Sequence, residues 1–265
     1  MMRGDFHVHS NFSDGADPPE AVVRAALDRG MTRLGFSDHG YAAYDGDCCI
    51  PRARVSAYRE TVAALRETYR GRIEIFCGVE QDLYSDAPTE GFDYVIGSVH
   101  YLYLGGEYHA LDWKPEILRE TCARFFGGDM YALTAAYYEA VAAVHARTGC
   151  DIIGHFDLIS KFNERERLFD PADPRYITAW QAAAEALLPC GVPFEINTGA
   201  MSRGWRTAPY PAEDIMRYLA ARGARFVLSS DSHSAETLCY DFEAQTRRAA
   251  ALGLELTAFE RRLLE

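Results

Sequence analysis

The sequence predicts an α/β protein built on a parallel sheet, in which short strands alternate with longer helices from one end of the chain to the other. Three observations favour this fold class. Short apolar runs rich in β-branched and aromatic residues recur along the chain, longer amphipathic stretches lie between them, and glycine follows most of these stretches. Strands in this order pair in parallel through right-handed helical crossovers, either in an open sheet or in a closed barrel.

Seven strands are expected. Each is a short apolar run bounded by turn-forming residues, and in order they span residues 5–9, 34–38, 73–80, 94–100, 151–155, 193–197 and 226–231. Helices are expected between or after them at residues 18–29, 55–69, 129–148, 176–188, 211–222 and 235–252. The first helix illustrates the reasoning, because Asp17 precedes its start and Gly30 follows its end, and both residue types are favoured at helix termini.

Two long polar connections interrupt this regular order. The connection at 101–128 contains GGEYHALDWKP, and the connection at 156–175 contains KFNERER and DPADP. Both leave the C-terminal ends of strands, where α/β proteins keep their functional sites. We therefore expect lid-like, substrate-binding insertions within a single domain that spans residues 1–265.

Composition argues against several classes of protein. At 265 residues the chain has the length of one α/β barrel, and no apolar run approaches the ~20 residues that span a bilayer. The N-terminal residues lack the apolar core of a signal peptide, and the seven cysteines contain no C-x-x-C pair, so a cytoplasmic location with reduced thiols is expected. The formal net charge of −12 disfavours a nucleic-acid polymer, so a small molecule is the expected partner; the oligomeric state stays open.

Histidine and acidic residues gather at the ends of the predicted strands, where six of the eight histidines lie. The nine side chains are His7, His9, Asp38, His39, Glu80, His100, His155, Asp231 and His233. The C-terminal ends of parallel strands meet at one rim of a sheet, so these side chains are expected to converge. An ordinary hydrogen-bonded role is the simplest interpretation of any one histidine, but it does not explain the shared placement.

The residue types at this rim predict a metal centre. Imidazoles mixed with carboxylates, without thiolates, suit Zn²⁺, Mn²⁺ or iron. The candidates exceed the roughly four to six ligands that a single ion takes, so two or three ions are expected. Asp14 lies in the S-D-G turn after the first strand, where it is either a turn-forming residue or a further ligand or acid at the same rim.

A site with several metal ions most naturally performs hydrolysis, because neighbouring ions lower the pKa of a bound water and orient a phosphoryl group. The sequence contains no P-loop, no G-x-G-x-x-G fingerprint and no G-x-S-x-G elbow. Kinase, dehydrogenase and serine-hydrolase functions are therefore not expected.

Six short segments, in this order over nearly the whole chain, resemble the PHP (polymerase and histidinol phosphatase) family of metal-dependent phosphoesterases. They are HVHS at 7–10, SDH at 37–39, GVE at 78–80, GSVH at 97–100, GH at 154–155 and SDSH at 230–233. Within the family, the chain length and the segments GHFDLISKFN, EINTGAMSRG and SSDSHSAETLCYDF resemble the stand-alone histidinol-phosphate phosphatases of histidine biosynthesis. The resemblance implies a distorted (β/α)7 barrel with up to three ions at the C-terminal ends of its strands.

The resemblance also implies ligand sets. One ion would be held by His7, His9, Glu80 and Asp231, a second by Glu80, His100 and His155, and a third by His39, His233 and Asp14. The catalytic candidates are then Glu80, as the bridge between two ions, and Asp14 and His233, as candidate general acids. Asp38 is expected to orient a histidine.

Family members bind the substrate phosphate with basic side chains from the loops after the fifth and sixth strands. The residues at these places are Lys161 in the first loop and Arg203 and Arg206 in the second. Each is equally well explained as a solvated surface cation. Lysine lacks the bidentate fork of arginine, which makes Lys161 a weaker phosphate-binding candidate.

The expected activity is hydrolysis of the phosphate monoester L-histidinol phosphate. This substrate carries an amine and an imidazole, so acidic residues near the lid segments are expected to select it, and the candidates are Asp45, Asp47, Glu107 and Asp157. Two alternatives stay open. One is another PHP-type phosphoesterase, acting on nucleotides or other phosphomonoesters, and the other is a non-catalytic metal-binding domain that has kept the barrel.

Overall fold

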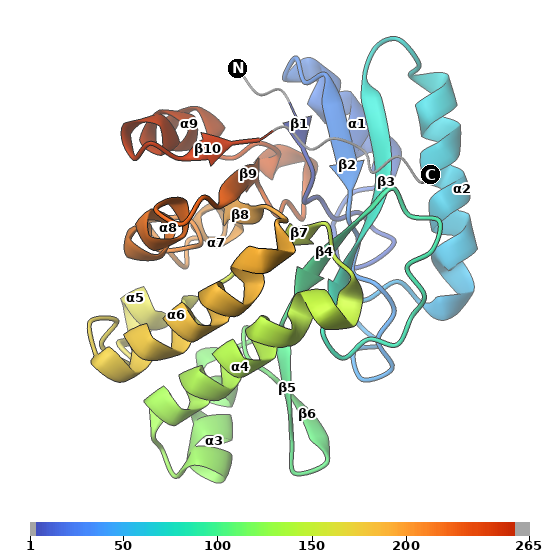
Figure 1. Cartoon of the computed structure of the whole chain (residues 1–265). Helices are drawn as coiled ribbons and strands as arrows, with labels where there is room; N and C mark the ends of the chain where they lie inside the picture. The colour runs from blue at the N-terminus through green and yellow to red at the C-terminus, as the bar shows by residue number, and fades with distance from the viewer. Residues whose placement is uncertain (1–3, 258–265) are drawn as a thin grey trace.

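A parallel sheet forms the centre of the computed structural model, which describes residues 4–257 (Figure 1). In spatial order its strands are β1 (Gly4–Asp5), β2 (Arg33–Phe36), β3 (Glu74–Asp82), β4 (Tyr94–Ser98), β7 (Ile152–Ile153), β8 (Phe194–Asn197), β9 (Arg225–Ser229) and β10 (Glu255–Leu256). Every neighbouring pair is parallel. The C-terminal ends of all these strands therefore lie at one rim, as the positions of the polar residues predict.

The sheet curls until its two sides meet at that rim. Val8, just after β1, forms a parallel bridge with Ser232, just after β9. Two backbone hydrogen bonds hold the closure: the His9 amide donates to the Ser232 carbonyl at 2.8 Å, and the Ser232 amide donates to the His7 carbonyl at 3.1 Å. The predicted distorted α/β barrel is confirmed, and its closure brings residues 7–9 beside residues 230–232.

Helices between the main strands cover the outside of the curled sheet (Figure 1). They are α1 (Pro19–Asp28), α2 (Val55–Thr68), α4 (Met130–Thr148), α6 (Pro174–Leu187), α8 (Glu213–Ala220) and α9 (Phe242–Ala251). Their apolar sides pack inward, as in α8, where Ile215 and Leu219 are buried. In α4 the Asp129 side chain caps the first turn, and Gly149, with a φ of 63°, follows the last.

The segments expected as lids have secondary structure of their own. Residues 101–128 contain an antiparallel hairpin, β5 (Tyr101–Leu104) and β6 (Glu107–Ala110), followed by α3 (Pro115–Phe126). In Figure 1 this hairpin projects away from the main sheet. Two short helices, α5 (Asn163–Glu166) and α7 (Gly199–Ser202), follow β7 and β8. Turns of 3-10 helix lie at Arg52–Arg54, Leu158–Ser160, Leu188–Cys190 and Ala235–Thr237.

Two predicted boundaries are wrong. The sequence predicts one helix at 235–252, but α9 starts only at Phe242. Cys239 and Asp241 have left-handed φ values of 54° and 58°, which a continuous α-helix cannot contain. The first strand ends at Asp5 rather than at residue 9, and beyond it the chain joins β9 through the isolated bridge at Val8.

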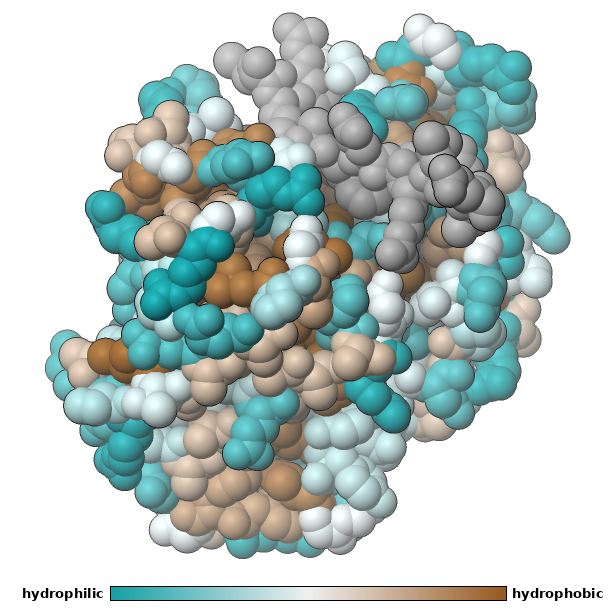
Figure 2. All heavy atoms as spheres, in the orientation of Figure 1, coloured by the Kyte–Doolittle hydropathy of each residue, from teal (hydrophilic) through white to brown (hydrophobic). Residues whose placement is uncertain are grey.

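Hydrophilic and hydrophobic residues are interspersed over the face of the molecule that Figure 2 shows. Aromatic side chains fill much of the interior, and among the largest that are fully buried are Tyr58, Tyr137, Tyr138, Phe156 and Phe194. Within residues 4–257, no helix has the length and apolar character needed to cross a membrane.

Candidate metal centre

Glu80 lies at the centre of the converging acidic and histidine side chains. It belongs to β3 and is 1% exposed. Its Oε2 atom lies 3.1 Å from His7 Nε2 and 3.0 Å from His39 Nδ1. Its Oε1 atom lies 2.9 Å from His155 Nε2 and 3.3 Å from His100 Nε2. Its Oε2 atom also lies 3.5 Å from His9 Nε2, so one carboxylate contacts five imidazoles from the ends of four strands.

Asp231 reaches the same cluster from the other side of the barrel closure. It follows β9 and has a φ of 49°, a strained conformation of the kind that is concentrated at functional sites. Its Oδ1 atom lies 3.5 Å from His9 Nε2 and 3.8 Å from His7 Nε2. Because the bridge at Val8 joins these two segments, the closure of the barrel itself assembles this part of the cluster.

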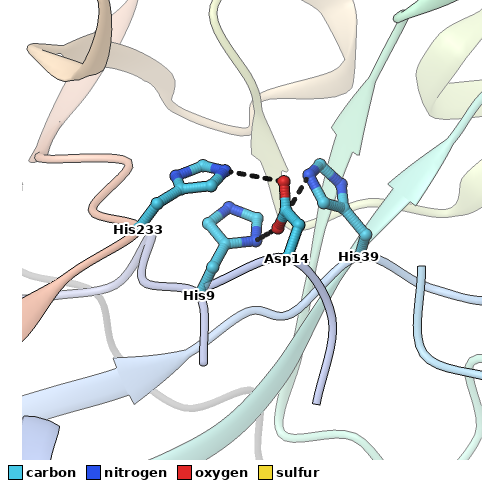
Figure 3. A group of neighbouring side chains, drawn as sticks. All are labelled: His9, Asp14, His39 and His233. Atoms are coloured by element: carbon cyan, nitrogen blue, oxygen red, sulfur yellow. Dashed lines mark ion pairs between the residues drawn. The ribbon is translucent and has the colours of Figure 1, made fainter. Parts of the chain in front are cut away.

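Asp14 forms a further group with three imidazoles (Figure 3). Its carboxylate points between them, at 3.6 Å from His9 Nδ1, 3.8 Å from His39 Nε2 and 3.1 Å from His233 Nε2. The side chains of Asp14 and His233 are 27% and 28% exposed, so this is the open side of the cluster. Of the two interpretations of Asp14, the geometry favours a ligand or acid over a purely turn-forming residue.

Four sets of side chains have ligand atoms within 4.8 Å of one another, close enough to share an ion. The sets are His9, Asp14, His39 and His233; His7, Glu80 and His155; His7, His9 and Asp231; and His39, Glu80 and His100. The structure thus brings together all nine ligands that the family resemblance implies. Because several members belong to two sets, the sets form one continuous cluster.

Buried atoms without a hydrogen-bond partner mark the middle of this cluster. They are His7 Nε2, both ring nitrogens of His9, and Glu80 Oε2. His7 Nε2 and Glu80 Oε2 are 3.1 Å apart but lack the geometry of a hydrogen bond. An unsatisfied buried polar atom costs about 1–3 kcal/mol, and a cation among these atoms would satisfy them. Nitrogen and oxygen donors without sulfur fit zinc, manganese or iron.

The surrounding charges keep the carboxylates of the cluster ionised. Burial alone would raise the pKa of Glu80, but His7 and His39 lower it well below its usual value. Burial would also raise the pKa of Asp231, but Arg203 and His7 lower it well below its usual value. Both groups therefore present anionic oxygens, the form that binds a cation.

Adjacent imidazoles differ in their charge. Burial, with the charges of His233 and His39, lowers the pKa of His9 to about 3, so this ring is neutral near pH 7 and keeps a lone pair for a metal. Burial would also lower the pKa of His39, but Glu80 and Asp14 raise it to about 9. A bound cation would take the place of the proton that His39 shares with these carboxylates.

Glu195, in β8, is a residue of the site that the sequence analysis missed. Its Oε1 atom lies 2.6 Å from His7 Nδ1, and its Oε2 atom accepts a hydrogen bond from the His155 amide at 2.9 Å. This carboxylate fixes the His7 ring so that Nε2 faces Glu80. The sequence does contain a clue to this role, because Glu195 is a charged residue inside the apolar run PFEIN. A strand that is buried on both faces rarely carries a charge without a function.

Asp38 does not orient a histidine, and that prediction is wrong. Its Oδ1 atom accepts hydrogen bonds from the amides of Ser10 and Ser13 at 2.8 and 3.1 Å, and from the Ser13 hydroxyl at 2.7 Å. These bonds hold the turn that carries Asp14. Adjacent residues at a strand end point in different directions, so proximity to His39 in sequence did not bring Asp38 to its ring.

A cavity of about 250 Å³ opens onto the cluster and is lined by most of its members. Two of the predicted phosphate-binding cations, Lys161 and Arg203, also line it. Lys161 Nζ donates to the Asp112 carbonyl at 2.7 Å and to Asp112 Oδ2 at 2.9 Å. Arg203 Nη2 donates to Asp231 Oδ2 at 3.0 Å. Both cations are thus held in place by acidic partners beside the metal-ligand candidates.

Arg206, the third predicted phosphate-binding residue, lies outside the lining of this cavity. It is 9% exposed, and its Nη1 atom donates to Asp157 Oδ2 at 3.3 Å and to the Ser160 hydroxyl. Its Nη2 atom donates to the Pro209 carbonyl at 3.3 Å. The side chain is not a solvated surface cation, and it ties the loop after β8 to the loop after β7.

Comparisons with known proteins agree with this geometry. Residues 5–199 match the family model of the PHP domain. A Deinococcus radiodurans protein named "Probable histidinol-phosphatase" is 32% identical in an alignment that covers 98% of this chain and 98% of the relative. A Bacillus subtilis protein named "Histidinol-phosphatase" is 23% identical, over 94% of this chain and 100% of the relative.

The fold is also similar to that of a solved structure, the histidinol phosphate phosphatase of Lactococcus lactis in complex with zinc, L-histidinol and phosphate. The TM-score is 0.73 at 20% sequence identity, and the superposition covers 98% of this chain and 97% of the other. At this identity the likeness concerns the fold, and it extends over the whole barrel.

Proposed function

The chain belongs to the PHP domain family, and we propose that it is a metal-dependent phosphatase that hydrolyses L-histidinol phosphate to L-histidinol and phosphate. The observation that carries the proposal is the convergence of six histidines and three carboxylates beside a cavity that also holds Lys161 and Arg203. A phosphoric monoester hydrolase needs both parts, a site for metal ions and cations for the phosphate. The relatives and their names support the choice of substrate.

Zinc, manganese or iron would be held by the three sets of residues that the family resemblance implies, two of which share Glu80. The sets are His7, His9, Glu80 and Asp231; Glu80, His100 and His155; and Asp14, His39 and His233. All nine residues belong to the cluster that the structure forms. When bound, such ions lower the pKa of a water and neutralise charge on the phosphoryl oxygens. Glu80 stays ionised and contacts five imidazoles, which makes it the residue on which the whole cluster depends.

Arg203 and Lys161 would hold the phosphate of the substrate. Arg203 lies at the edge of the cluster, with Nη2 at 3.0 Å from Asp231 Oδ2 and Nη1 at 3.0 Å from His233 Nδ1. Its planar fork suits two phosphoryl oxygens at once, and its charge opposes the negative charge that develops on them. Lys161 adds a positive charge from the loop after β7, and its bonds to Asp112 fix it before the substrate arrives.

The departing alkoxide needs a proton, and Asp14 and His233 are the residues placed to manage it. Their side chains meet at 3.1 Å, line the cavity and form the open side of the cluster. Asp14 is ionised, because His39 and His233 lower its pKa in spite of burial, so the proton donor of the pair would be His233, in a state in which it does not hold the third ion. Glu80 cannot serve, because it is buried and ionised.

Phosphate release by the purified protein tests this proposal. The substrates are L-histidinol phosphate, a nucleoside monophosphate and p-nitrophenyl phosphate, and the zinc, manganese and iron content is measured on the same samples. We expect the highest kcat/KM with L-histidinol phosphate, loss of activity on chelation, and its return with added metal. A higher kcat/KM with the nucleotide would favour the nucleotide-directed alternative. A metal-loaded protein that releases no phosphate would indicate the non-catalytic alternative.

A further inference from the structure

Part of the cavity lining is not explained by binding of the phosphate. Apart from the metal-ligand candidates and the two cations, the lining includes Asp45, Tyr101, Asp112 and Trp113. The substrate has a phosphoryl part and an alcohol part, and the alcohol must lie against residues that do not hold the phosphate. We infer that these residues form the subsite of the leaving group, and that Asp45 selects an alcohol with an ammonium group by accepting its hydrogen bond. This inference rests on the proposed function and adds a residue that sets its specificity.

Asp112 is not available for the same task. Lys161 Nζ lies 2.9 Å from Asp112 Oδ2 and also bonds to the Asp112 carbonyl. Lys161 lowers the pKa of Asp112 to about 2 in spite of burial, so this carboxylate is ionised and already paired with a cation. In the described part of the chain, by contrast, no lysine or arginine pairs with Asp45. An ammonium group entering the cavity would therefore find its free anionic partner at Asp45.

The structure also distinguishes among the four acidic residues that the sequence leaves unranked. Asp47 is exposed and is not part of the cavity lining. Glu107 is exposed at the hairpin and pairs with Arg124 at 3.2 Å. Asp157 is fully buried against Arg206. Of the four, Asp45 alone faces the cavity.

The backbone holds Asp45 in place at the cavity. Its amide donates to the Ala42 carbonyl at 3.1 Å, and its side chain lines the cavity together with Tyr101 and Cys48. Burial, together with the charge of Asp45, raises the pKa of Cys48 to about 12, so this thiol stays protonated and remains a donor. A residue whose backbone is fixed in this way loses less conformational entropy when it binds a ligand.

Aromatic contacts join the loop that carries Asp45 to the hairpin β5–β6. The ring of Tyr44 stacks on Tyr108 at 3.9 Å between centroids and meets Tyr101 edge-on at 5.0 Å. The Tyr44 hydroxyl donates to Asp82 Oδ1 at 2.5 Å, which ties the loop to β3. Trp113 lies at the cavity with 58% of its surface exposed, so its indole offers a face for the flat imidazole of a histidinol leaving group.

A pair of substrates that differ only in the amine tests the role of Asp45. They are L-histidinol phosphate and its deamino analogue, 3-(imidazol-4-yl)propyl phosphate, assayed with the metal-loaded wild type, Asp45→Asn and Asp47→Asn. We expect the wild type to prefer L-histidinol phosphate and Asp45→Asn to reduce the kcat/KM ratio of the two substrates by about 10- to 100-fold, as for loss of a hydrogen bond to a charged group. Asp47→Asn, two residues away in the same loop but outside the cavity, should keep the wild-type ratio.

Inhibition by the two products gives a second measurement that does not depend on turnover of the substrate. Asp45→Asn should weaken inhibition by L-histidinol much more than inhibition by inorganic phosphate. Tyr101→Phe, which removes a hydroxyl of the same subsite but leaves the charge of Asp45, should lower the preference for the amine less than Asp45→Asn does. Metal content and circular dichroism of each variant show whether the cluster and the fold are intact.

The outcomes separate this inference from the function on which it rests. An active wild type with an unchanged substrate ratio in Asp45→Asn would overturn the role of Asp45 and leave the proposed function standing. An equal loss of kcat/KM with both substrates would also overturn the role of Asp45 in selecting the amine, because Asp45 would then support the site as a whole. A wild type that releases no phosphate from L-histidinol phosphate would overturn the proposed function and the inference with it.

Discussion

Glu195 connects two of the metal-ligand candidates through one carboxylate. It contacts His7 Nδ1 at 2.6 Å and accepts from the His155 amide at 2.9 Å, and the Ser229 hydroxyl donates to it at 2.6 Å. Burial would raise the pKa of Glu195, but His7 lowers it, so the carboxylate is charged. A charged acceptor behind a histidine fixes the ring and makes its other nitrogen a better ligand.

Replacement of Glu195 should therefore weaken metal binding. We expect Glu195→Ala to lower zinc affinity by about 10- to 100-fold, measured by competition with a chelator of known affinity. Glu195→Gln should lose less, because its amide oxygen can still accept a hydrogen bond from His7. Glu185→Ala is the matched control, since Glu185 lies on the surface with Tyr218 and Arg222. Equal zinc affinity in wild type and Glu195→Ala would contradict the positioning role.

The sequence predicts the histidines of the cluster because their chemistry and their position agree. His7, His39 and His155 each lie two or three residues after the end of a strand, and parallel strands bring such residues to one rim. Glu195 and Asp38 could not be assigned in this way. Their roles depend on which side chain lies across the barrel, and only the three-dimensional arrangement determines that.

At the scale of secondary structure, the main strands and helices follow from hydrophobic patterning, and the departures have local causes. The hairpin β5–β6 was not expected, although the run YLYL favours a strand and Gly105 and Gly106, with φ values of 60° and 90°, form the two-residue turn typical of hairpins. The strand β10 contains only two residues, Glu255 and Leu256, too few for any periodic pattern. Left-handed residues interrupt the helix expected at 235–252.

Asp5 stabilises the closure of the barrel from inside β1. It is fully buried, and its carboxylate accepts hydrogen bonds from the Ser230 hydroxyl at 2.5 Å and from the amides of Ser230 and Cys239 at 3.1 Å each. These bonds join the first strand to the segment after β9, which carries Asp231. The segment after β9 is therefore anchored to β1, the first strand of the sheet.

Loss of the Asp5 carboxylate should destabilise this junction. Asp5→Ala leaves buried donors of Ser230 and Cys239 without partners, and we expect the free energy of unfolding to fall by about 1–3 kcal/mol, measured by urea denaturation. Asp28→Ala, at the exposed end of α1, is the control and should change it by less than about 0.5 kcal/mol. An equally small effect of Asp5→Ala would show that the closure does not depend on these bonds.

At the scale of the whole molecule, folding collects buried ionisable groups that the unfolded chain would leave in water. Glu80, Asp231 and His7 are nearly or fully buried at one place, and two of their polar atoms, His7 Nε2 and Glu80 Oε2, lack hydrogen-bond partners. Burial of such groups is costly unless a cation compensates for it. Metal binding should therefore contribute directly to the stability of the fold, because the ligand set exists only in the folded chain.

Thermal unfolding of the chelated and zinc-loaded protein tests this coupling. A ligand present at 100 times its Kd stabilises the native state by about 2.7 kcal/mol per site, and for a chain of this size that corresponds to an increase in Tm of about 5–10 °C. Glu80→Gln should bind little zinc and show a much smaller increase, because the central carboxylate of the cluster is lost. The same Tm for chelated and zinc-loaded wild type, with zinc shown to be bound, would mean that the cluster is held in place by the barrel alone.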